Sequence, residues 1–291
     1  MRRLALACAL LLLVLPSVPV PAESRVDAAP QWNRGDRWEY RVTVRGPAET
    51  MFGNLTQEVS AVGPFRLGDR TVDTYTLASK QTGSGNNVES STVSTTYVSG
   101  SDLCLLYVNS TSVTRYETLD SSARMELRYN ASDGRYRFPL EAGAEWETEY
   151  VLIRSVWLDS GLAVDNRTVH ARSGCEGVVN VSVPAGRFRA LKVVCYPDSS
   201  NRTSYWFSGA VRGDVMREEM DGTTGVITSY ELNCYRRSLE PIFLLGTDTG
   251  LALLLGIISA VLAAAALAIF WARSRERRAS PPKNEGPGGS L

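Results

Sequence analysis

Few residues of this chain have the types and spacing that acid–base catalysis needs. His170 is the single histidine, so a Ser-His-Asp arrangement would have to use it. No Gly-x-Ser-x-Gly sequence is present to hold a serine nucleophile at a strand-to-helix turn. We therefore interpret His170 as a residue on the face of a strand, and we predict that the protein is not an enzyme.

Acidic residues gather in one stretch that holds Asp214, Glu218, Glu219 and Asp221. Their spacing lacks the regular oxygen-ligand pattern of an EF-hand loop, which favours a solvated turn over a calcium site. One histidine and disulfide-bonded cysteines cannot supply a zinc site. The sequence thus predicts no metal and no cofactor. Two carboxylates could still meet in space as in glycoside hydrolases, so an envelope hydrolase stays open as a further alternative.

Four cysteines follow the N-terminal apolar segment, at Cys104, Cys175, Cys195 and Cys234. An even number in an exported domain indicates two disulfides. Two β-rich runs flank Pro184-Ala185-Gly186, and a hairpin centred on Ala185 would place Cys175 opposite Cys195. Cys104 and Cys234 then form the second pair by elimination. The alternative is four reduced, buried thiols.

The chain also carries Asn-x-Ser/Thr sequons without a central proline, at Asn54, Asn109, Asn130, Asn166, Asn180 and Asn201. Their number favours a glycosylated surface. The alternative is a Ser/Thr-rich β-protein with accidental matches. A glycan at Asn180 requires that this side chain lie on the outer face of its strand.

The elements that must position these residues are β-strands. Large apolar and polar residues alternate over 38–44, 71–77, 145–151 and 228–232, which is the period of half-buried strands. Gly-Pro, Asn-Asn and Asp-Gly pairs separate them. We expect antiparallel sheet, as a sandwich, a barrel or an open curved sheet.

An internal repeat organises these strands. The Gly-x-x-Trp-Glu sequence at 35–39 returns 108 residues later at 143–147, and an aromatic-x-Ser-Gly sequence at 97–100 returns at 206–209. Two landmarks in the same order at nearly one spacing, with Glu-Leu closing each unit, predict two related β units. The pattern leaves open whether they form separate domains or one sheet.

The second unit resembles a known family. It contains Val-Pro-Ala-Gly-Arg-Phe at 183–188, Tyr-Trp-Phe-Ser at 205–208 and Glu231-Leu232, preceded by Phe138-Pro139-Leu140. In this order the motifs resemble the TapB-like secreted β-proteins, which are distantly similar to LolA-type lipoprotein carriers. The resemblance implies a strongly curved antiparallel half-barrel, and some members of that wider group hold acyl chains in the concave face.

Tryptophans are the remaining candidates for binding, at Trp32, Trp38, Trp146, Trp157 and Trp206. They could line a groove for a sugar or a lipid, or they could pack the core. Trp38 and Trp146 occupy repeated positions, which favours the core for these two.

Apolar segments at both ends predict a membrane anchor. Residues 249–272 carry no charged side chain, and a helix of this length crosses a hydrocarbon core. Trp271 fits an interfacial anchor at the end of this segment. A basic cluster follows, formed by Arg273, Arg275, Arg277 and Arg278. Basic clusters stay on the cytoplasmic side, so we expect the tail in the cytoplasm. Arg2, Arg3 and a short apolar run predict a secretory signal.

The predicted organisation is a signal peptide (1–22), a first β unit (23–130), a second β unit (131–238), a juxtamembrane linker (239–248), a transmembrane helix (249–272) and a disordered cytoplasmic tail (273–291). The predicted fold is all-β, with two antiparallel units that form a curved sheet, a half-barrel or a sandwich, together with one membrane helix.

The charge balance and the predicted membrane anchor indicate a cell-surface protein. The 31 basic and 31 acidic residues balance, so no basic face indicates nucleic acid. We expect a single-pass protein of the cell membrane with its β-domain outside, in a non-enzymatic binding or structural role. Its partners would be the membrane and an apolar ligand or a surface protein. The main alternative is a carrier of lipid or another apolar ligand.

Overall fold

The computed structural model describes residues 25–47, 49–116 and 120–238. Within these ranges no helix is long and apolar enough to span a membrane. The predicted signal peptide, linker, transmembrane helix and tail, including Trp271 and the basic cluster, lie outside the described residues.

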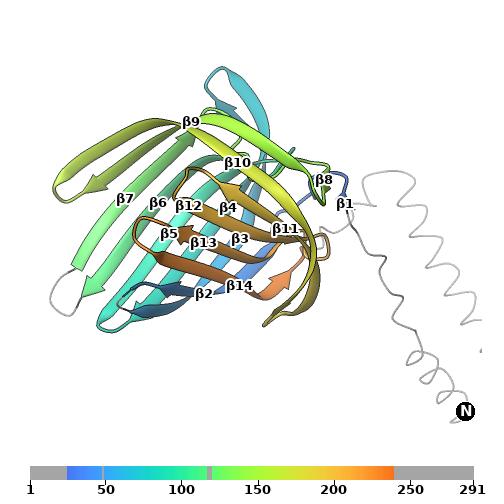
Figure 1. The fold of residues 1–291 in the computed structure, drawn as a ribbon. Coiled ribbons are helices and arrows are strands. Elements are labelled where there is room, and N and C mark those ends of the chain that lie inside the picture. The colour runs from blue at the N-terminus through green and yellow to red at the C-terminus, as the bar shows by residue number, and fades with distance from the viewer. Residues whose placement is uncertain (1–24, 48, 117–119, 239–291) are drawn as a thin grey trace, which may run out of the picture. The chain divides into compact units, whose positions relative to one another are not determined.

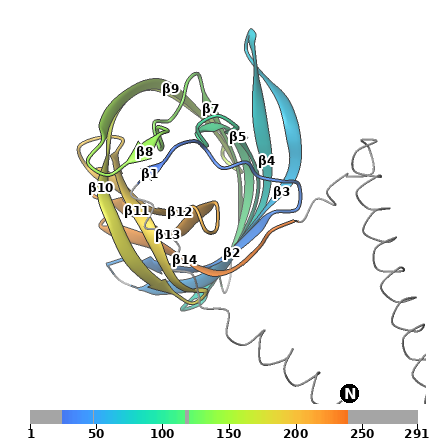
Figure 2. The same ribbon diagram turned by 90° about the vertical axis from the view of Figure 1, so that its right-hand side faces the viewer.

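The described residues form a closed antiparallel barrel of 12 strands (Figures 1 and 2). The first six are β2 (Arg37–Arg45), β3 (Thr50–Leu67), β4 (Arg70–Gly85), β5 (Val88–Ser99), β6 (Leu105–Tyr116) and β7 (Asp120–Tyr129). The second six are β9 (Glu145–Leu158), β10 (Gly161–Val183), β11 (Gly186–Tyr196), β12 (Asn201–Ser208), β13 (Gly213–Asp221) and β14 (Val226–Arg236). The short β1 (Arg25–Val26) and β8 (Leu140–Glu141) pair with each other.

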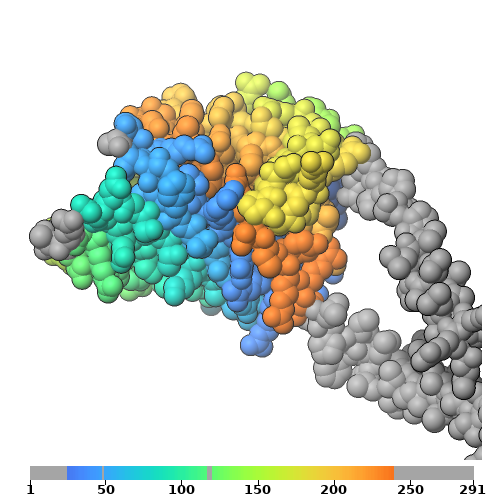
Figure 3. Space-filling model, turned by 90° about the horizontal axis from the view of Figure 1, so that it is seen from below, coloured from blue at the N-terminus to red at the C-terminus, as the bar shows by residue number. Residues whose placement is uncertain are grey.

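Each half of the sequence contributes one continuous six-stranded sheet to the barrel. The open edges of the two sheets pair, β7 with β9 and β14 with β2. Figure 3 shows the consequence on the surface, where the orange C-terminal strands adjoin the blue N-terminal ones. The all-β prediction is confirmed. Of the expected arrangements, the barrel is the one observed. The two units do not form separate half-barrels or a sandwich, because each half covers the unpaired edges of the other.

The repeat is visible in backbone geometry. Gly35 and Gly143, which begin the two landmarks, both have positive φ, 89° and 84°. Gly35 N donates to Val59 O, and Gly143 N donates to Cys175 O, each at 2.7 Å. A bulge follows each acceptor, in β3 after Val59 and in β10 after Cys175. The two halves therefore begin with the same turn and the same bend.

A second set of equivalent features lies in the hairpin of β5 and β6 in the first half and of β12 and β13 in the second. Register shifts occur at Tyr97/Val98 and at Trp206/Phe207. Leu103 and Arg212 then adopt positive φ, 58° and 56°. The equivalent positions are 109 residues apart, so this region has the same spacing and the same backbone irregularities in both halves.

The hairpin register of β10 and β11 differs from the predicted one. Val183 pairs with Gly186, so the turn holds two residues rather than three, and the bulge after Cys175 shifts the pairing again. Cys175 consequently lies opposite Val193, and Cys195 lies opposite Ser173. Diagonal neighbours are about 7–8 Å apart, too far for a disulfide without movement of the backbone.

The predicted disulfides are absent from the structure. Cys104, Cys175 and Cys195 are free and buried, and Cys234 is free and exposed. Cys104 Sγ instead lies 3.7 Å from the carbonyl oxygen of Tyr136. The arrangement matches the alternative of reduced thiols for three of the four residues.

Candidate functional site

The barrel interior contains a cavity of about 220 Å³. Its apolar wall comes from the first half of the chain and includes Trp32, Trp38, Leu77, Val98, Leu105 and Val108. Its polar wall comes from the segment between β7 and β9 and from β13, and includes Arg135, Tyr136, Asp214, Arg217 and Glu219. The cavity is thus amphipathic.

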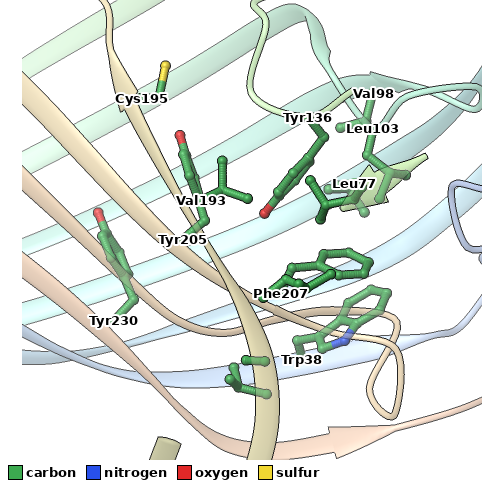
Figure 4. Packing of buried hydrophobic residues seen from close by; sticks show 14 of the residues in the cluster. Trp38, Leu77, Val98, Leu103, Tyr136, Val193, Cys195, Tyr205, Phe207 and Tyr230 are labelled. Atoms are coloured by element: carbon green, nitrogen blue, oxygen red, sulfur yellow. The ribbon is translucent and has the colours of Figure 1, made fainter. Parts of the chain in front are cut away.

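The segment between β7 and β8 closes one side of this space. Tyr136 is buried, and its ring centroid lies 5.6 Å from Tyr205 and 5.4 Å from Phe207 (Figure 4). The carbonyl of Gly134 accepts hydrogen bonds from Trp146 Nε1 and Ser173 Oγ, at 2.7 and 3.1 Å. These contacts hold the segment inside the barrel, where it carries Arg135 to the cavity.

Two guanidinium groups stack on tyrosines of the polar wall. Arg217 pairs in register with Tyr205 on β12 and with Tyr230 on β14. Its Cζ lies 3.9 Å from the ring centroid of Tyr230, and Arg135 Cζ lies 5.0 Å from that of Tyr205. Cation–π contacts of this kind stabilise desolvated arginines, so aromatic rings replace part of the lost hydration.

Carboxylates partly neutralise these arginines. Arg217 Nε lies 3.1 Å from Glu219 Oε1, and Arg135 Nη2 lies 3.6 Å from Asp133 Oδ2. The Nε atoms of both arginines are nevertheless buried without a hydrogen-bond partner. In the part of the chain that the structure describes, such buried side-chain atoms occur in one other residue, Arg37.

Asp214 sits at the centre of the polar wall. Tyr136 Oη donates a hydrogen bond to its carboxylate, and Tyr40 Oη donates to its backbone carbonyl at 3.1 Å. Burial raises the pKa of Asp214, while the Tyr136 hydroxyl and the two arginines oppose that rise. Burial and the neighbouring Asp214 charge also raise the pKa values of Tyr136 and Tyr40, so both tyrosines stay protonated donors.

The acidic residues singled out in the sequence do not form one cluster. Asp214 faces the cavity, whereas Asp221 accepts hydrogen bonds from Thr223 N and Thr224 N within its own turn. Glu218 pairs with Arg202 at 3.4 Å. Among the described residues no three potential ligands are placed to hold a metal ion. The solvated-turn interpretation is confirmed for Asp221 and is wrong for Asp214.

His170 lies on a strand face, as predicted. It is an exposed residue of β10, and its Nδ1 lies 3.4 Å from Glu149 Oε2 on β9. The register places Glu149 directly opposite. His170 is not one of the residues that line the cavity.

The sequon asparagines lie at or near the surface. Asn54, Asn130, Asn166 and Asn180 are exposed, and Asn109 and Asn201 are half-buried. Asn180 therefore meets the requirement stated for a glycan at that position. Asn201 Nδ2 donates to Asp198 Oδ2 at 2.8 Å, and Asn130 Oδ1 accepts from Val151 N, so these two amides already have partners.

The tryptophans divide as their repeated positions indicate. Trp38 and Trp146 are buried core residues, which confirms that prediction. Trp32 lines the cavity, and its ring centroid lies 5.0 Å from that of Trp38. Trp157 and Trp206 are half-buried beneath Arg124 and Lys192, outside the cavity lining.

Arg135, Tyr136 and Arg217 were not identified from the sequence. Arg135 and Tyr136 lie in an irregular segment, and Arg217 belongs to an ordinary alternating strand. One signal was available: the repeat aligns Arg217 with Val108 and Asp214 with Leu105. Charged residues at positions that are apolar in the other copy could have marked the polar wall.

Comparison with known proteins gives no family. No protein-family model matches the chain, and no curated protein matches it. Among solved structures, it is similar to a protein from Parabacteroides distasonis described as a "putative lipoprotein". The two are 9% identical with a TM-score of 0.32, over 72% of this chain and 99% of the other. A likeness at this level carries no information about function.

Proposed function

We propose that the protein binds a small apolar or amphipathic molecule inside its barrel. The main support is the cavity of about 220 Å³ inside the barrel. It remains open between an apolar wall, which includes Trp32, Trp38, Val98 and Val108, and the polar wall. A purely structural barrel would fill this space with its own side chains. We infer further that residues 249–272 tether the barrel to the outside of the cell membrane.

The size of the cavity limits the ligand. Sites for drug-sized molecules measure roughly 300–1,000 Å³, and this cavity is smaller at about 220 Å³. The proposed ligand is therefore a single short chain or a single ring system rather than a diacyl lipid. The eight-carbon alcohol 1-octanol is a suitable probe, because it is neutral and tests the apolar wall alone.

A pair of substitutions on β6 tests the proposal. Val108 lines the cavity, whereas Val113 lies on the outer face of the same strand. Val108→Phe places a larger side chain in the cavity and should weaken 1-octanol binding by about tenfold or more. Val113→Phe adds the same volume outside and should leave the affinity unchanged.

The measurement is isothermal titration calorimetry of the full chain held in solution by an amphipathic polymer, with polymer alone as the blank. Circular dichroism verifies that both variants keep the β fold. Saturable binding to the unsubstituted protein that Val108→Phe leaves intact would place the ligand elsewhere. No saturable binding of alcohols with six to ten carbons would remove the proposal.

A further inference from the structure

The charged wall of the cavity is not required by the barrel itself. By strand pairing, Thr96, Val108 and Leu127 form a row across the first half, and Tyr205, Arg217 and Tyr230 form the equivalent row across the second. In both halves the three residues lie side by side on adjacent strands. The first copy forms its wall without a charge, so the barrel can close with uncharged residues at these positions.

A second substitution between the copies adds to the contrast. Leu105 pairs with Val98 next to the bulge of the first half, and Asp214 pairs with Phe207 next to the bulge of the second. Burying an ionisable side chain is costly both when it stays charged and when it must be neutralised. An acid placed where the same backbone accepts leucine is therefore better explained by a ligand than by folding.

The polar wall also has unused hydrogen-bond donors. Arg135 Nε and Arg217 Nε are buried and have no partner, and a buried donor without an acceptor is costly. The Arg135 guanidinium lies over the ring of Tyr205, Arg217 is the register partner of Tyr205 on the next strand, and both arginines line the cavity. Glu219 Oε1 lies 3.1 Å from Arg217 Nε but makes no hydrogen bond with it. An acceptor oxygen in the cavity would satisfy both donors.

The balance of charge permits that acceptor to be an anion. Asp133 and Glu219 each lie beside one of the two arginines. Burial raises the pKa of Asp214, and Tyr136 and Tyr40 remain protonated donors. Neither Asp133 nor Glu219 makes a hydrogen bond to the Nε atom of its arginine, so both Nε–H groups can still donate to an anionic acceptor.

We propose that the bound molecule is a small monocarboxylic acid whose carboxylate accepts hydrogen bonds from Arg135 and Arg217. Its apolar body then lies against Trp38, Val98 and Val108. This inference rests on the proposed ligand binding inside the barrel and adds the chemical class of the head group.

The test compares three eight-carbon ligands that differ only in the head group: octanoate, 1-octanol and octylamine. Hydrogen bonds to charged groups are stronger than neutral ones, so octanoate should bind the full chain about tenfold or more tightly than 1-octanol at pH 7.5. Octylamine, which is cationic, should bind more weakly than either.

Substitution of Arg217 tests whether this arginine causes the preference for octanoate over 1-octanol. Arg217→Met retains the length of the side chain and should remove the advantage of octanoate over 1-octanol, while 1-octanol affinity changes by less than about threefold. Arg41→Met is the matched control, because Arg41 is an exposed residue paired with Glu231. If Arg217→Met fails to fold, Arg135→Met serves for the same comparison.

The outcomes separate the two proposals. Equal affinities for octanoate and 1-octanol would overturn the carboxylate assignment and leave ligand binding intact. Tightest binding of octylamine would show that Asp214 and Glu219 govern the site, which also overturns the assignment. Binding of none of the three would remove ligand binding itself.

Discussion

At the scale of single residues, the polar wall shows how burial sets the charge of one carboxyl group. Asp214 is enclosed by Tyr136, Arg135 and Arg217, and its pKa is raised because burial outweighs these favourable contacts. The folded protein therefore holds the Asp214 proton to a higher pH than the unfolded chain does. Stability contributed by that proton is complete at low pH and is lost as pH rises from the unfolded to the folded pKa.

Asp214→Asn should remove this dependence. The asparagine oxygen still accepts the hydrogen bond from Tyr136, but the side chain never ionises. Urea unfolding of the full chain between pH 4 and 7 should show the variant gaining stability relative to the unsubstituted protein as pH rises.

Asp221→Asn is the matched substitution and should show the opposite pH dependence. Hydrogen bonds from Thr224 and Thr223 in its turn lower the pKa of Asp221. Asp221→Asn should therefore be less stable than the unsubstituted protein, and this loss of stability should shrink as pH falls. A deficit of Asp214→Asn that grows toward pH 7 would contradict the assignment.

At the scale of elements, each half depends on the tight turn that begins it. Gly143 has φ 84° and open space where a Cβ would lie, so Gly143→Ala meets only the backbone penalty and should lower the free energy of unfolding by about 1–2 kcal/mol. Gly63 also has open space but lacks a positive φ, so Gly63→Ala should be neutral or slightly stabilising. Urea denaturation midpoints measure both, and equal effects would show that the turn is not strained.

The elements were more predictable than their pairing. Alternation of apolar and polar residues gave the strands around Trp38 and Trp146, because a half-buried strand imposes that period on its sequence. The register around Cys175 was missed, because a bulge leaves no mark in composition and moves every later pair. For the same reason Cys175 and Cys195 do not lie directly opposite each other, as the predicted disulfide between them requires.

At the scale of the whole molecule, closure follows from the repeat. A six-stranded sheet with two open edges exposes unpaired backbone groups, and a second related sheet covers both. The sequence landmarks revealed the two copies but could not reveal closure, because the edge strands β7, β9, β14 and β2 read like any other strands. The cavity was equally hidden, because it arises between residues of opposite halves, such as Val108 and Arg217.

Quenching of tryptophan fluorescence by 8-bromo-1-octanol tests the location of the ligand most directly. Bromine quenches an indole on contact, and Trp32 and Trp38 line the cavity whereas Trp157 does not. Binding inside the barrel predicts saturable quenching that persists in Trp157→Phe and is largely lost when Trp32 and Trp38 are both replaced by Phe. Quenching that is undiminished in the double variant, in a protein that keeps its β fold, would contradict a ligand site inside the barrel.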